Sequence, residues 1–218
     1  MKRILLYGAT GRTGSLIVHY ALQQGYAVTA LVRNPSKLAV HSENLTVIRG
    51  TPTNAADVRQ ALRGCDVVIS ALSALPESQI LSFRKIVAPH TLETAMRHTI
   101  TCMNETGIRR IVTLSSIGAS ESRPYAPWYM RLMIRLTNFR LVFADHAAQE
   151  ALLRSSRLDW TIARPVALNN HEHLGKLVVS YNTTPSPFKM SRRQLAQFLV
   201  DCVERPDLVH QAPLLSEV

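Results

Sequence analysis

The sequence predicts an α/β protein, a single domain built on a Rossmann-type, doubly wound parallel sheet. Short β-rich runs alternate with helical patterns along the 218 residues, which is the order that parallel βαβ units require. A glycine-rich turn joins the first apolar run to the first helical pattern. The composition, with 46% hydrophobic and 18% charged residues, provides for one core and argues against disorder.

Strands and helices alternate regularly in the first half of the chain. The run 3–7 is apolar throughout, as expected for a strand covered on both faces. A helix at 13–24 follows from apolar residues at helical spacing, and Gly25 ends it. Asn54 is a favourable N-cap for a helix that reaches Leu62. The other strands expected here lie at 27–32, 45–49 and 66–70.

The second half continues this alternation and then becomes less regular. After a loop rich in serine, alanine and proline, we expect a long helix at 87–106 and a strand at 109–114. A second helical region lies within 127–155 with a break near Asn138, and Pro165 stops a strand at 159–164. The remaining elements expected are a strand at 177–181, a helix at 191–203 and a short terminal strand. Within one domain at 1–218, residues 165–218 are expected to contribute a small substrate lobe.

Residues 8–14, Gly-Ala-Thr-Gly-Arg-Thr-Gly, are the strongest functional signal. They follow a predicted strand and open a predicted helix, which is the context that phosphate binding requires. Gly8 permits the sharp turn, Gly11 lets the backbone approach a pyrophosphate, and Gly14 lets the helix pack closely on the sheet. Free N–H groups and the helix dipole stabilise the phosphate charge. The segment therefore predicts a dinucleotide site.

The residues after the second strand indicate NADP(H) rather than NAD. An NAD site usually places an acid there to bind the ribose 2′-hydroxyl. Here Arg33 takes that position, and the sequence has no acidic residue before Glu43. A guanidinium can bind a 2′-phosphate with two hydrogen bonds, and an acid would repel it. Arg12 and Lys37 are close enough in sequence to assist.

Several stretches occur in an order that resembles a known family. They are GATGRTG, GYAVTALVRNPSKL, IVTLSS, DHAAQEALLRSSRLDWTIARP and MSRRQLAQFLVDC. Together they resemble the atypical short-chain dehydrogenases/reductases related to biliverdin reductase B and the NmrA-like NAD(P)-binding proteins, and the likeness spans nearly the whole chain. The resemblance implies a cytosolic Rossmann protein that binds NADPH. Some members pass its hydride to flavins, quinones or tetrapyrroles, and others only sense the cofactor's redox state.

The resemblance also implies positions for individual residues. Ser116, after the fifth strand, matches a serine near the nicotinamide, and His146 matches a histidine at the start of the helix before the sixth strand. The implied cofactor contacts are Gly8, Thr10, Gly11, Arg12, Thr13, Gly14, Arg33, Ala71, Leu72, Pro165 and Val166.

Two departures from the family pattern affect what can be carried over. Gly50-Thr51-Pro52 replaces the usual Gly-Asp, whose aspartate lies near the adenine. Val166 replaces a second histidine of the biliverdin reductase B pattern. The adenine contacts are therefore left open, and Val166 weakens a specific tetrapyrrole or flavin assignment.

The candidate catalytic groups are Ser116 and His146. The Tyr-x-x-x-Lys pair, in which the lysine lowers the tyrosine pKa, is absent, because Tyr125 and Tyr129 are followed four residues later by Tyr129 and Met133. Ser116 would orient the carboxamide or a polar substrate atom, and His146 would donate a proton with Asp145 tuning it. The alternatives are capping roles, with the serine in its turn and the Asp-His pair at a helix start.

Residues 128–143, WYMRLMIRLTNFRLVF, are both apolar and basic. The stretch fits a membrane-surface helix, a core-facing helix with its cations toward water, or one wall of the substrate cleft. Arg192 and Arg193 are interpreted as surface charge. His171-Glu172-His173 is interpreted as a solvated loop, so no metal site is expected.

The net charge of +10 favours anionic partners such as phosphate-bearing cofactors. No recognition motif accompanies this charge, so nucleic-acid binding is disfavoured. Cys65, Cys102 and Cys202 are widely spaced, which indicates reduced thiols. The first apolar run is too short for a signal peptide, and no later segment is long and apolar enough to cross a membrane. We therefore expect a cytoplasmic protein.

These observations predict an NADPH-dependent reductase that transfers a hydride to a flavin, a quinone or a similar planar acceptor. Because NADPH carries the difficult chemistry, the missing Tyr-Lys pair does not exclude this activity. The alternative is a non-catalytic, NADP(H)-sensing regulatory protein of NmrA-like type. A homo-oligomer or a regulatory protein partner is left open.

Overall fold

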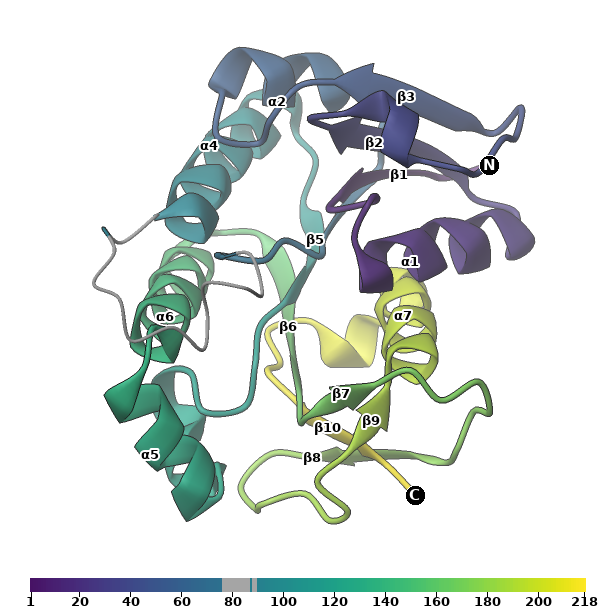
Figure 1. Cartoon of the computed structure of the whole chain (residues 1–218). Helices are drawn as coiled ribbons and strands as arrows, with labels where there is room; N and C mark the ends of the chain where they lie inside the picture. Colours follow the sequence, from purple (N-terminus) through teal and green to yellow (C-terminus); the bar gives the residue numbers. More distant parts are fainter. Residues whose placement is uncertain (76–86, 88–89) are drawn as a thin grey trace.

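A twisted eight-stranded sheet runs through the middle of the protein (Figure 1). The computed structural model describes residues 1–75, 87 and 90–218. The strand order is β3-β2-β1-β4-β5-β6-β10-β8, and every pair is parallel except β8 with β10. This confirms the predicted fold class. The strands are β1 (Arg3–Tyr7), β2 (Ala27–Val32), β3 (Leu45–Arg49), β4 (Val67–Ser70), β5 (Arg110–Leu114), β6 (Asp159–Pro165), β8 (Leu177–Ser180) and β10 (Leu214–Glu217).

Helices cover both faces of this sheet. Two of them, α1 and α7, pack together on one face, and α2, α4 and α6 cover the other (Figure 1). None of the helices in the described ranges is both long and apolar enough to span a bilayer. The helices are α1 (Arg12–Gln23), α2 (Ala55–Ala61), α4 (Thr91–Thr106), α5 (Trp128–Leu136), α6 (Phe139–Ser155) and α7 (Arg192–Asp201).

The element boundaries agree closely with the sequence signals. Asn54 caps α2 by accepting a hydrogen bond from the Ala56 amide at 2.9 Å. The expected break near Asn138 separates α5 from α6. The long helix expected from residue 87 begins at Thr91 in the structure, and residues 88–89 of that prediction lie outside the described part of the chain.

The apolar run of β1 is buried on both faces, as its sequence predicts. Ile4 and Leu6 belong to the core cluster beneath α1 and α7, whereas Leu5 and Tyr7 belong to the cluster beneath α2 and α4. Successive side chains of a strand point to opposite faces, so one continuous hydrophobic run supplies both cores.

The segment after Pro165 is divided between the sheet and a small addition to it. β10 continues the sheet beside β6, and β8 forms its antiparallel edge. Only β7 (Leu168–Asn169) and β9 (Met190–Ser191) form a separate two-stranded pair, beyond the carboxyl end of β6. The substrate role expected for residues 165–218 stays a prediction.

A buried ionic network ties β6 to the helical layer. Arg164 on β6 is 2% exposed and pairs with Glu150 on α6, which is fully buried. Arg164 also donates two hydrogen bonds of 2.9 Å to the exposed Glu121. Burial alone would lower the pKa of Arg164, but the hydrogen bonds to Glu150 and Glu121 raise it above its usual value. Ser115 donates to Glu150 at 2.5 Å, so the network also holds the turn after β5.

Replacing Glu150 with alanine is expected to lower the free energy of unfolding by about 3 kcal/mol. This is the lower end for breaking a buried ion pair, because Glu121 would still contact Arg164. Urea denaturation followed by circular dichroism would measure the loss. Glu105→Ala is the matched control, since Glu105 pairs with Arg59 at an exposed site and its removal should change stability little. Equal stability of the two variants would contradict this account of the network.

Candidate functional site

The loops after β1 and β4 meet at the point where the strand order reverses. A Cβ atom on Gly8 would lie 2.4 Å from the Ala71 carbonyl oxygen, and Gly8 has a φ of +81°. A Cβ atom on Gly14 would lie 1.9 Å from the Gly8 carbonyl oxygen. Both positions therefore exclude every residue except glycine. In doubly wound sheets, ligands bind at this reversal, beyond the carboxyl ends of the strands.

The N-terminus of α1 supplies the surface that a phosphate group would contact. Its N-cap is Gly11, so no side chain from that position covers the N–H groups of the first turn. Thr10, Gly11 and Arg12 are exposed, whereas Thr13 and Gly14 are buried against the sheet. This glycine cradle with an open helix N-terminus fits a dinucleotide pyrophosphate.

Arg33 lies directly after β2 with its side chain exposed, at the position predicted for 2′-phosphate recognition. Lys37 is also exposed, in a short 3-10 turn that Asn34 caps by accepting from the Ser36 amide. After β3, the segment Gly50-Thr51-Pro52 contacts an aspartate of α2. The Asp57 carboxylate there accepts a hydrogen bond of 2.8 Å from the Thr51 amide.

A cavity of about 410 Å³ lies beyond the carboxyl ends of β5 and β6. Both α5 and α6 contribute to its wall, so residues 128–143 line a cavity, and its use as the substrate cleft stays a prediction. Most of its lining is apolar, and its polar members are few. The lining comprises Leu114, Ser115, Ser116, Tyr129, Met130, Met133, Ile134, Phe139, Val142, Phe143, His146, Pro165, Val166, Ala167, Leu168, Phe188 and Arg192.

Four of the predicted site residues come together in this cavity. Ser116 follows β5, His146 projects from α6, and Pro165 and Val166 end β6. The Ser116 hydroxyl donates to the Ile117 carbonyl at 3.2 Å in this structure. Ala71 and Leu72 lie instead beside Gly8, at the end of β4. The predicted residues thus divide between a phosphate loop and an apolar cavity along one edge of the sheet.

His146 is buried and differs from its sequence-based description. It lies within α6, which begins at Phe139, and not at a helix start. Burial lowers its pKa to about 4, although Glu150 and Asp145 oppose that shift. Its Nδ1 lies 3.1 Å from the Gln149 amide nitrogen, and that nitrogen also donates to the Leu114 carbonyl. An amide nitrogen only donates, so Nδ1 accepts and the neutral ring carries its hydrogen on Nε2.

Asp145 is turned away from the cavity. Its carboxylate accepts hydrogen bonds of 2.9 Å from the amides of Leu92 and Glu93, at the N-terminus of α4. It therefore caps a neighbouring helix, and neither its own helix nor the His146 ring is its hydrogen-bond partner. The expectation that Asp145 tunes His146 holds only as a weaker electrostatic effect.

Arg192 is a cavity residue that the sequence interpretation treated as surface charge. It lies at the rim of the cavity and also lines a smaller hollow of about 170 Å³ together with Arg12. Burial lowers the pKa of Arg192, and the nearby charge of Arg12 lowers it further. Arg192 at the start of α7 and Arg12 in the phosphate loop lie close together, so this rim is electropositive. The sequence signal that could have indicated this position of Arg192 is the Ser-Arg-Arg motif, which places it in the first turn of a helix.

Comparison with known proteins identifies relatives of the chain. The model of an NAD(P)H-binding family matches residues 8–206. An uncharacterized chloroplastic protein of Arabidopsis thaliana is 27% identical over 210 residues, which cover 93% of this chain and 72% of that protein. The chain spans about a third of the length of the plant reductases that it matches over shorter stretches.

Solved structures share the fold. The anaerobilin reductase ChuY of Escherichia coli O157:H7 has a TM-score of 0.81 at 22% identity. The alignment covers 99% of this chain and 97% of ChuY. A short-chain dehydrogenase/reductase of Veillonella parvula, solved in complex with NADP, has a TM-score of 0.78 at 17% identity, with coverages of 99% and 94%.

The low pKa of His146 predicts a loss of stability in mild acid. Below about pH 6.5 the unfolded chain takes up a proton on this ring that the folded protein does not take up until about pH 4. The free energy of unfolding should therefore fall by about 3 kcal/mol across that range. Urea unfolding at a series of pH values would measure this slope. His146→Gln should flatten it, whereas the exposed His41→Gln should leave it, and an unchanged slope in His146→Gln would contradict the assignment.

Proposed function

The chain belongs to the NAD(P)H-binding family, and from that membership we propose that it is an NADPH-dependent reductase of a flavin, a quinone or a similar planar acceptor. The observation that carries the proposal is the apolar cavity at the ends of β5 and β6, on the same edge of the sheet as the phosphate loop. A dinucleotide held at Gly8–Gly14 can extend along this edge toward β5 and β6. Its reactive end would then form one boundary of the cavity.

The choice of NADPH rests on charge. Arg33 occupies the position where an acid would select NAD, and Arg12 and Lys37 add positive charge nearby in the sequence. The Veillonella parvula relative, with the same fold, was solved with NADP. Family membership alone supports either dinucleotide, so this preference is part of the proposal.

The cavity is suited to a flat, weakly polar acceptor. Its volume of about 410 Å³ falls within the usual range for small-molecule sites, and four aromatic and two thioether side chains stand among the aliphatic residues of its wall. ChuY, a structural relative, is described as an anaerobilin reductase. The lining thus favours stacking and dispersion over many directed hydrogen bonds.

The residues of this chain would position the reactants. The bound dinucleotide supplies a hydride and is oxidised, and the acceptor gains that hydride and one proton. The Ser116 hydroxyl can bind the carboxamide or a polar acceptor atom. His146 is neutral near pH 7, so its Nε2–H serves as a hydrogen-bond donor and not as a source of the proton. Water supplies that proton.

We place the protein in the cytoplasm. Its three cysteines are buried and none of them is in a disulfide, as expected for a reducing compartment.

Steady NADPH oxidation with flavin mononucleotide or a naphthoquinone would test the activity. The proposal predicts saturable turnover in which NADPH is consumed in proportion to the acceptor reduced. Calorimetry would measure NADPH binding in the same preparation. Tight NADPH binding without turnover on any acceptor would overturn the reductase proposal and favour the NmrA-like sensor.

Arg33→Asp is expected to lower the preference for NADPH over NADH by about 10- to 100-fold. A charge-assisted hydrogen bond to the 2′-phosphate contributes about 1.5–3 kcal/mol, and the aspartate would add repulsion. The ratio of the two dissociation constants is the measurement. Arg63→Asp removes an exposed arginine from the turn after α2 and serves as the control. A preserved NADPH preference in Arg33→Asp would refute this role.

Ala167→Trp should obstruct the acceptor site without weakening NADPH binding. Ala167 is exposed within the cavity wall, so a larger side chain can occupy the space without disturbing the core. We expect kcat/KM for the acceptor to fall by about tenfold or more, which corresponds to about 1.4 kcal/mol of lost contact. Ala144→Trp, at an exposed position of α6 that does not line this cavity, is the control. Unchanged kcat/KM would exclude this cavity as the acceptor site.

A further inference from the structure

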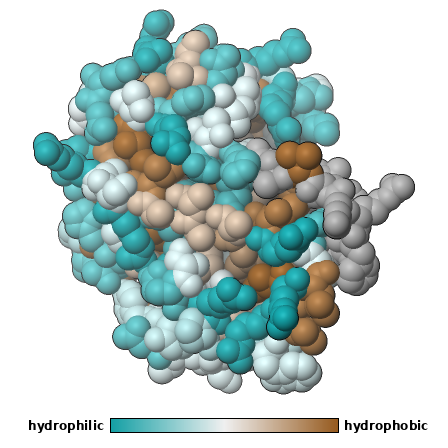
Figure 2. Space-filling view, turned by 90° about the vertical axis from the view of Figure 1, so that its left-hand side faces the viewer, coloured by the Kyte–Doolittle hydropathy of each residue, from teal (hydrophilic) through white to brown (hydrophobic). Residues whose placement is uncertain are grey.

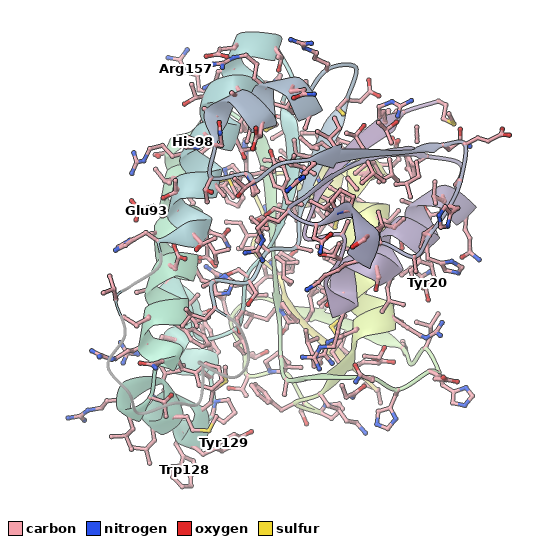
Figure 3. The ribbon with its side chains drawn as sticks, turned by 45° about the horizontal axis from the view of Figure 1, so that its top comes forward. Tyr20, Glu93, His98, Trp128, Tyr129 and Arg157 are labelled. Atoms are coloured by element: carbon pink, nitrogen blue, oxygen red, sulfur yellow. The ribbon has the colours of Figure 1, made fainter. Side chains whose placement is uncertain are left out.

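Helix α5 carries an unusual concentration of exposed hydrophobic side chains. It contributes nine residues, and five of them are large, apolar or aromatic, and well exposed. In Figure 3, Trp128 extends from α5 at the lower edge of the molecule and points away from the other elements. The five exposed fractions are 70% for Trp128, 47% for Tyr129, 47% for Leu132, 40% for Met133 and 58% for Leu136.

The exposed side chains lie on the outer face of the helix. At about 100° per residue, they occupy an arc of about 140°. Ile134, which is buried, and Met130, which packs against the core, lie on the opposite side. A helix on the surface of a globular protein usually turns polar residues to solvent. On α5 the solvent-facing side is hydrophobic as well.

Positive charge lies along one flank of this outer face. Arg131 and Arg135 lie on α5, with Arg123 before the helix and Arg140 after it, and all four are exposed. No acidic residue occurs between Glu121 and Asp145. Those two carboxylates are engaged elsewhere, by Arg164 and by the N-terminus of α4. Figure 2 shows this side of the protein, where hydrophobic surface lies directly beside strongly hydrophilic side chains toward the lower right.

We propose that α5 binds the surface of an anionic lipid bilayer. An exposed tryptophan and tyrosine with leucines on one face, bordered by arginines and free of acids, is the pattern of a helix that lies in the membrane interface. The arginines bind anionic headgroups, and the apolar face enters the boundary between headgroups and acyl chains. The net charge of +10 adds attraction toward the same surface.

This surface also borders the cavity. Tyr129 and Met133 are exposed on α5 and line the cavity wall as well. A protein docked through α5 therefore holds the cavity at the membrane, where lipophilic molecules are concentrated. If the proposed reductase function holds, its acceptor is of the lipophilic quinone class and enters from the bilayer.

Tryptophan fluorescence can locate the contact. Trp128 and Trp160 are the two tryptophans, and Trp160 is only 6% exposed, so the Trp160→Phe variant reports on Trp128. With vesicles of phosphatidylcholine and phosphatidylglycerol, Trp128 emission should shift to shorter wavelength and be quenched by brominated acyl chains. Phosphatidylcholine alone should give a much smaller effect, and high salt should reduce binding. An unshifted, unquenched Trp128 would overturn the proposal.

Vesicle sedimentation of matched variants separates this surface from general charge effects. Replacing Leu132 and Leu136 with glutamate should abolish binding. The control is Leu174→Glu, which should not abolish it, because Leu174 is as exposed to solvent as Leu132. Arg131→Gln and Arg135→Gln should each weaken binding by about fivefold, as expected for one arginine near an anionic surface. The exposed Arg63→Gln should weaken it less. Equal losses of binding at the α5 and control positions would refute the bilayer as the partner. So would a parent protein that does not bind vesicles but changes its oligomeric state when α5 is substituted.

Two quinones test delivery from the membrane. A short-chain, water-soluble quinone and a long-chain quinone in vesicles are compared in the Leu132→Glu, Leu136→Glu double variant, whose changed residues do not line the cavity. Only the rate of reduction of the long-chain quinone should fall. We expect a fall of about tenfold, because the variant no longer holds the cavity at the membrane where this quinone is concentrated. Equal losses for both would overturn the delivery step. If the parent protein reduces neither quinone, the proposed function fails, while sedimentation still decides membrane binding.

Discussion

The close approach of three backbone segments at the strand-order reversal is the constraint on which the site depends. Gly8, Ala71 and the first turn of α1 meet with no space for a Cβ atom on Gly8 or Gly14. This contact directs the N-terminus of α1 across the ends of β1 and β4, so it would fix one end of a dinucleotide bound there. The length of that dinucleotide would then determine which strand ends its reactive group could reach. The cavity lies beyond the ends of β5 and β6, on the same edge of the sheet.

A second constraint maintains the cavity itself. The turn after β5 and the last residues of β6 form adjacent parts of its wall, and both are joined to α6 through Glu150. A buried charged pair is costly to form and gives little net stability, but it tolerates few alternative arrangements. Its value here is therefore positional, because Ser116 and Pro165 adjoin residues that the network holds. The hydrogen bond from Gln149 to Leu114 adds a second link between α6 and the end of β5.

Local signals allowed the sequence to predict most of the fold and the tight geometry of the glycine loop. The glycine loop, the Asn54 cap and the uniform apolar strands act over a few residues, so their meaning does not depend on distant contacts. The cavity was harder, because its wall joins α5, α6, β6 and Phe188, which only tertiary folding brings together. Arg192 resembled a surface residue for the same reason. Asp145 was misleading because its hydrogen-bond partners are more than 50 positions earlier in the chain.

The neutral state of His146 has a consequence for selectivity. A site that offers a hydrogen bond but no acidic proton near pH 7 would distinguish acceptors by their basicity only weakly, because it transfers no proton to them. Choice among acceptors then falls to thickness, width and electron affinity, which many conjugated molecules share. Such a protein would tolerate chemically diverse oxidants of similar shape, and its physiological specificity would come from where it resides and which oxidants are abundant there.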